Sequence, residues 1–167
     1  MPTLDSALIA NRQAVVAFLT KACTVPAERW VHPVEPGKWS PAQIADHVSI
    51  SYEVAVRALK GDATNGSAPW FLRPIARAYA FTSVLKNGAF PEVMRGPPSF
   101  APSTSHPTYD ASVIRMEAAV ADLEAHTREM AGAGADTFVH PVFGRLIVTD
   151  YVRYSELHAR HHQAQLG

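Results

Sequence analysis

Apolar residues recur every three or four positions through most of this chain, which is the spacing of one face of an α-helix. The pattern predicts amphipathic helices over residues 3–23, 41–59, 110–130 and 149–166. No stretch alternates clearly between apolar and polar residues, so we expect no β-strand. For the last helix, Thr149 or Asp150 is the expected N-cap.

The start of the second helix carries the strongest local signal. Ser40 is a favoured N-cap, Pro41 follows at the first helical position, and Gln43 stands three residues after Ser40. Together they form a capping box with a proline that costs the helix no hydrogen bond. Gly61 is the expected C-terminal stop.

Residues 62–108 separate the second and third helices and form an insertion. Residues 70–86 are expected to hold a short helix broken at Pro74, and residues 96–107, with four prolines, a loop. We therefore predict an all-α fold, a four-helix bundle with a long, partly helical insertion between helices 2 and 3. Residues 1–167 are expected to form a single domain.

Composition and charge narrow the class of protein. The 15 Lys and Arg residues balance the 15 Asp and Glu residues, which argues against a nucleic-acid partner or an anionic membrane. One cysteine, Cys23, permits no internal disulfide and is expected to be a small core residue. The chain shows no signal peptide and no apolar run long enough to span a bilayer, so a cytoplasmic location is expected.

Histidines are the candidate chemical groups, and three of them lie close together near the C-terminus. His158 and His162 are four residues apart, so both imidazoles lie on one helix face, as in many two-histidine metal sites. His158 and His161 form the competing pair. The apolar stripe of this helix has His162 near its middle, which favours His158 with His162 and leaves His161 at the margin of the bundle.

His47 lies on the apolar stripe of the second helix and is the third inward histidine. Three imidazoles satisfy one divalent cation and leave a coordination position open. The alternatives are that these histidines are hydrogen-bonded core residues, or that the C-terminal ones favour the negative end of the helix dipole.

Two sequence segments resemble signatures of the DinB-like superfamily. Residues 39–47, WSPAQIADH, resemble its W-S-x-x-x-x-x-x-H signature, and residues 158–166, HARHHQAQL, its H-x-x-H-H-x-x-Q-L signature. Residues 140–144, HPVFG, resemble a segment that precedes the last helix in one branch. The resemblance covers nearly the whole chain and is weakest over residues 62–108.

The resemblance implies a four-helix bundle whose metal ion is held by His47, His158 and His162. It also implies thiol-dependent S-transferases or isomerases that use a low-molecular-weight thiol. We therefore predict a metal-dependent enzyme, a thiol-dependent transferase or a hydrolase, that acts on a small molecule. Zinc and nickel are the first candidates for the ion. The alternatives are a metal-binding or stress-response protein without catalysis and a purely structural bundle.

Five residues are expected to support the site. Tyr151 and Ser155 are expected to line a pocket or to pack in the core, and Gln165 to hydrogen-bond a ligand histidine or cap the helix end. His161 is expected at the bundle margin. His140 is expected to shape a turn, with pocket lining as the alternative.

The remaining expectations concern surfaces and helix ends. Phe71, Tyr79 and Phe81 are expected to supply an apolar surface for a homodimer. Trp39 is expected to pack under a helix end, and Asp46 to face water or a neighbouring helix.

Overall fold

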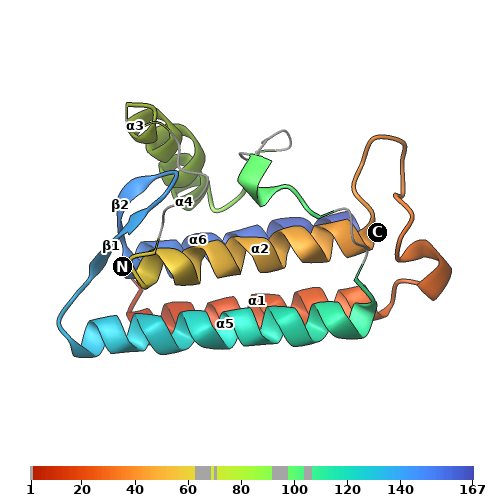
Figure 1. Cartoon of the computed structure of the whole chain (residues 1–167), viewed down its shortest axis with the longest axis horizontal. Helices are drawn as coiled ribbons and strands as arrows, with labels where there is room; N and C mark the ends of the chain where they lie inside the picture. The colour runs from red at the N-terminus through yellow and green to blue at the C-terminus, as the bar shows by residue number, and fades with distance from the viewer. Residues whose placement is uncertain (1, 63–68, 70, 92–97, 104–106) are drawn as a thin grey trace.

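The computed structural model describes residues 2–62, 69, 71–91, 98–103 and 107–167. These residues are mostly helical and include one small two-stranded sheet (Figure 1). The predicted helical class is therefore confirmed, and the sheet is the exception to it. Trp70, His106 and part of the predicted 96–107 loop lie outside the described residues.

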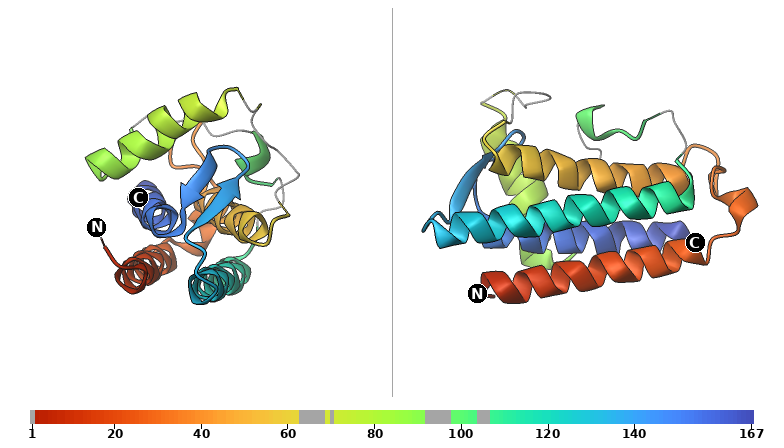
Figure 2. Two further views of the ribbon diagram at one scale, coloured as in Figure 1. Left: turned by 90° about the vertical axis from the view of Figure 1, so that its left-hand side faces the viewer. Right: turned by 60° about the horizontal axis from the view of Figure 1, so that its bottom comes forward.

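Four long helices run side by side along the molecule (Figures 1 and 2). They are α1 (Leu4–Cys23), α2 (Pro41–Leu59), α5 (Tyr109–Gly132) and α6 (Val148–Gln163). α1 packs mainly on α6, and α2 packs mainly on α5. α2 also contacts α6, and this contact brings the predicted histidines of the two helices together.

Side-chain caps fix where three of these helices begin. The capping box at α2 is present as predicted, with the Ser40 hydroxyl accepting from the Gln43 N–H and the Gln43 side chain accepting from the Ser40 N–H. Thr3 and Thr108 accept from backbone N–H groups in the first turns of α1 and α5. Each cap satisfies a helix N–H that has no partner within the helix.

The prediction of no strand was wrong. β1 (Thr137–His140) and β2 (Gly144–Ile147) form an antiparallel hairpin just before α6. Strands of four residues are too short to show a clear alternating pattern. β2 runs directly into α6, whose N-cap is Ile147 without a side-chain hydrogen bond, so the predicted cap was also wrong.

Two short helices between α2 and α5 cross one end of the long helices (Figure 2). They are α3 (Arg73–Ala76) and α4 (Ser83–Asn87), joined by a π-helical turn, Arg77–Thr82. Pro74 lies in the first turn of α3, where its missing N–H costs nothing, so it begins the helix instead of breaking it. α4 packs on α6.

Two surface expectations need correction. Phe81 is 4% exposed and packs in the core, so it cannot contribute to a dimer surface. Phe71 and Tyr79 are 60% and 69% exposed, and their pairing with a second copy stays a prediction. Cys23 is exposed at the last residue of α1 and is not a core residue.

Among the described residues, no helix is both long and apolar enough to cross a membrane.

Candidate metal centre

Three imidazole rings converge between α2 and α6. His47 lies on α2, two turns beyond the capping box, and His158 and His162 lie one turn apart on α6. Nε2 of His158 is 3.1 Å from Nε2 of His47 and 3.1 Å from Nε2 of His162. One ring nitrogen from each residue lies within 4.8 Å of the other two.

Hydrogen bonds at the far side of two rings fix their tautomers. Nδ1 of His47 is 2.6 Å from the carbonyl oxygen of Phe100, and Nδ1 of His162 is 2.8 Å from Oε1 of Gln165. A carbonyl oxygen only accepts, so in both residues Nδ1 carries the proton and donates it. Nε2 of each neutral ring therefore presents a lone pair to the centre of the cluster.

The three rings cannot satisfy one another. If Nε2 of His158 carries a proton, it can donate to Nε2 of His47 or of His162, and the other lone pair remains without a donor. A cation at the centre would accept all of these lone pairs. Bonds of about 2.0–2.1 Å in a tetrahedral site place ligand nitrogens about 3.3 Å apart. Two of the three nitrogen pairs are 3.1 Å apart, and all three nitrogens lie within 4.8 Å of one another. The donor set therefore fits a divalent ion.

Burial keeps the rings in the state that binds a metal. Desolvation lowers the pKa of His47 and lowers the pKa of His158 well below its usual value. Desolvation, with the charge of His47 as a smaller cause, lowers the pKa of His162 to about 3. All three imidazoles are therefore neutral at pH 7, and protons do not compete for their Nε2 atoms.

Aromatic rings frame the cluster. The ring of Trp39 lies 4.8 Å from that of His47 and stacks at 6.3 Å on His162. Phe90 lies 5.3 Å and Tyr154 6.4 Å from His158. Trp39 precedes α2 and also lies beside two of the three histidines. The position of Trp39 beside the histidines was not predicted.

An ion-pair network centred on the buried Asp46 holds the loop that supports His47. The Asp46 carboxylate is 2% exposed, accepts from the Ser103 N–H at 2.5 Å, and pairs with Arg115 of α5. Arg115 also binds both carboxylate oxygens of Glu53. Asp46 therefore faces a neighbouring helix, one of its two expected surroundings, and it anchors residues 98–103, which carry the Phe100 carbonyl.

The other predicted residues divide into two groups. Gln165 bonds His162 through Oε1 and donates from Nε2 to Nε2 of His161 at 3.0 Å, so His161 lies beside the cluster. Tyr151 is buried, and Ser155 donates its hydroxyl to the Tyr151 carbonyl oxygen. Tyr151 and Ser155 therefore pack in the core and form no hydrogen bond with the three histidine rings.

His140 shapes the hairpin turn, as expected. It is 1% exposed, and its Nδ1 accepts from the N–H groups of Val142 and Phe143. Nε2 must then carry the proton, and it has no hydrogen-bond partner among the described residues. Burial lowers the pKa of His140 to about 3.

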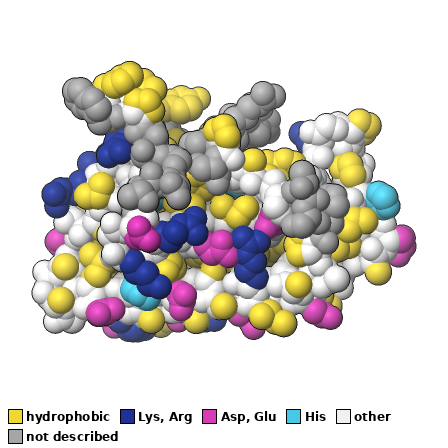
Figure 3. All heavy atoms as spheres, in the orientation of Figure 1, with side chains coloured by type: hydrophobic (Ala, Val, Ile, Leu, Met, Phe, Trp, Pro, Cys, Tyr) yellow, Lys and Arg dark blue, Asp and Glu magenta, His cyan; other side chains and the backbone are white. Residues whose placement is uncertain are grey.

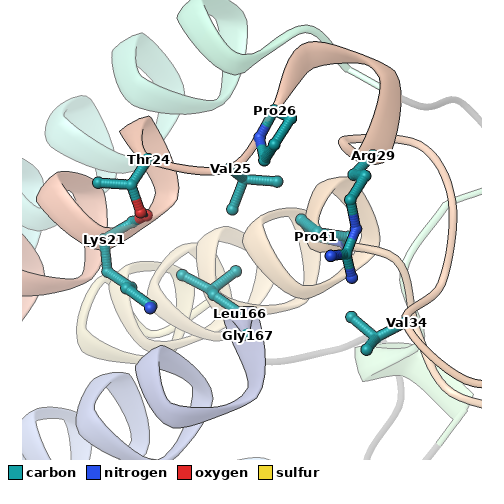
Figure 4. Close-up of a pocket in the computed structure, with 9 residues that line it drawn as sticks. All are labelled: Lys21, Thr24, Val25, Pro26, Arg29, Val34, Pro41, Leu166 and Gly167. Atoms are coloured by element: carbon teal, nitrogen blue, oxygen red, sulfur yellow. The ribbon is translucent and has the colours of Figure 1, made fainter.

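A small cavity of about 130 Å³ lies where α2 begins and where the chain ends after α6 (Figure 4). It is enclosed by the end of α1, the segment that follows it, Pro41 and Leu166. None of the three converging histidines lines it. We therefore place the candidate chemistry at the histidine cluster.

The low pKa of His140 predicts a specific pH dependence. The unfolded chain protonates this residue near pH ~6.5 and the folded chain near pH 3. Its stabilising contribution is complete above about pH 6.5 and is lost as the pH falls toward 3. In urea titrations of metal-free protein, His140→Gln should reduce the slope of unfolding free energy against pH by up to ~1.4 kcal/mol per pH unit. A His140 ring proton signal with a midpoint near pH ~6.5 would contradict this.

A known protein family matches the part of the chain that contains the three histidines. The family model described as the DinB superfamily matches residues 7–166, which include His47, His158 and His162. No significant match was found among curated proteins or among solved structures. Because the matched range covers nearly the whole chain, including both helices that carry the cluster, this protein belongs to the DinB superfamily.

Proposed function

We propose that this protein binds one divalent metal ion through Nε2 of His47, His158 and His162 and acts with it as an enzyme on a small molecule. The observation that carries the proposal is the convergence of one ring nitrogen from each of three neutral histidines. Two of these histidines already donate a hydrogen bond from Nδ1–H, which leaves Nε2 for the ion. Imidazole ligands suit zinc and nickel, and these are the ions that we propose.

Three protein ligands favour a catalytic site over a structural one. Structural zinc sites are usually closed by four protein ligands, whereas catalytic sites keep a position open. Bound in such a site, the ion supplies Lewis-acid chemistry that lowers the pKa of a water or thiol in the open position. Either nucleophile is consistent with the donor set, so the proposed reaction is transfer from a small thiol or hydrolysis.

The chain's own residues prepare the site for this role. The Phe100 carbonyl and the Gln165 side chain hold two ligand rings in one orientation, which is how metal-binding histidines are usually fixed. Trp39, Phe90 and Tyr154 surround the rings with apolar surface and limit the access of water. We further infer that α1, α2, α5 and α6 act as a four-helix bundle that supports the site, with the segment between α2 and α5 as an insertion.

Metal binding is the first test. Protein purified without a histidine tag should contain about one zinc or nickel ion per chain by elemental analysis. His47→Ala and His162→Ala should lose the ion, because each removes one of the three converging nitrogens. His161→Ala is the matched control and should keep it, since Nε2 of His161 is bonded to Gln165. A metal-free wild type, or loss in the control alone, would contradict the assignment.

Activity is the second test. Metal-loaded protein should catalyse either thiol conjugation to one member of an electrophile panel or hydrolysis in an ester and amide panel. The metal-free protein and His162→Ala should be inactive in the same assay. No turnover in either panel by the loaded protein would reject the enzyme and leave a metal-binding protein without catalysis.

The network around Asp46 predicts an effect at a distance from the ligands. Asp46→Asn removes the charge that holds Arg115, which loosens the Ser103 loop and the Phe100 carbonyl behind His47. Loss of such a support typically weakens metal binding about 10–100-fold, and calorimetry with zinc measures it. Glu53→Gln is the control, because Glu53 bonds Arg115 but not the loop, and its Kd should change less than about twofold. Equal effects of both variants would contradict this role for the loop.

A further inference from the structure

A second candidate site lies at the hairpin end of the molecule, lined by residues other than the three histidines. It is a groove of about 500 Å³ between the α3 segment and the β1–β2 turn. Small-molecule sites usually measure about 300–1,000 Å³, so the groove is large enough for a metabolite. Its charged and polar lining comprises Arg73, Arg77, Arg145 and Thr82, and its apolar wall includes Phe143.

The charged residues described in the lining of the groove are all arginines. Among the residues that the structure describes, three guanidinium groups line it and no carboxylate does. Arg77 and Arg145 make no ion pair with any of the described residues, although Arg145 donates to the hydroxyl of Thr137. In Figure 3, Lys and Arg side chains gather at this end of the molecule, beside the projecting α3. Because the chain as a whole has no net charge, this is a local excess.

Arg73 of α3 and Arg77 of the π-helical turn line the same groove. This placement does not help the helix to form. Arg73 and Arg77 are four residues apart, and like charges at this spacing repel and destabilise a helix. Arg145 approaches them from the hairpin. An anion between the three would turn this repulsion into attraction, and guanidinium groups bind carboxylate and phosphate through paired hydrogen bonds.

The two walls are anchored to the core, so the groove is preformed. Phe143 is buried, stacks on His140 at 4.8 Å and lies 5.5 Å from Phe81 of the opposite wall. Gly144 has φ +73°, a conformation that side chains disfavour, so the backbone of the turn favours glycine at this position. A site fixed in this way loses little entropy when it binds a ligand.

We propose that this groove binds a small organic anion, a molecule with carboxylate or phosphate groups beside an apolar part. The guanidinium groups would bind the anionic groups, and Phe143 would contact the apolar part. The inference is independent of the metal centre, because none of the three histidines lines the groove.

The test uses two probes that bind metal ions weakly, phenyl phosphate and isophthalate, with benzamide as the uncharged control. Titrations of the full chain are followed by amide NMR at about 0.15 M ionic strength. Saturable shifts of the Gly144 and Arg145 amide signals are expected with at least one of the two anions. Benzamide should cause no saturable shift at either residue. The stronger probe distinguishes phosphate from carboxylate as the recognised group.

Variants decide whether the groove is responsible. Arg77→Gln and Arg145→Gln should each raise the Kd by about tenfold, as expected for loss of one charged hydrogen-bond pair. Arg57→Gln is the matched control, because Arg57 is exposed and does not line the groove. Both groove arginines are exposed, so these variants should fold, which thermal unfolding checks. No saturable shift with either anion, equal weakening by Arg57→Gln, or full binding by the Arg77→Gln/Arg145→Gln double variant would overturn the proposal.

Discussion

The organising constraint in this structure is that three neutral imidazoles point their Nε2 atoms at one another. The Nδ1–H groups of His47 and His162 already donate hydrogen bonds on the far side of the rings. Turning either ring so that its Nε2 left the cluster would break that hydrogen bond. A buried polar atom without a partner costs about 1–3 kcal/mol. The chain carries this cost in the absence of a cation, and a cation removes it.

Each ring is positioned by a local feature and by a distant one. The capping box at Ser40 fixes the start of α2, and His47 follows two turns later on the face that meets α6. The distant support is the loop at residues 98–103, which Asp46 holds from the neighbouring position on α2. One helix therefore supplies both His47 and the carboxylate that anchors the hydrogen-bond partner of His47.

The sequence predicted the parts that depend on periodicity and failed where contacts are tertiary. Helix spacing located four helices, and the same spacing identified His47, His158 and His162 as inward residues that the structure brings together. The Phe100 carbonyl could not be predicted, because a backbone acceptor has no signature of its own. The pairing of Asp46 with Arg115 joins residues 69 positions apart, and nothing local indicates it. The hairpin was missed because each strand has only four residues.

Burial decides which ligand each of the two candidate sites selects. The histidine cluster and the arginine groove are connected through aromatic rings, since Tyr154 lies 5.6 Å from Phe143 and 6.4 Å from His158. On the buried side of these rings, desolvation removes protons from imidazole and leaves lone pairs that favour a cation. On the exposed side, guanidinium groups keep their charge and favour an anion. The same aromatic core thus separates the candidate cation site from the candidate anion site in a protein with no net charge.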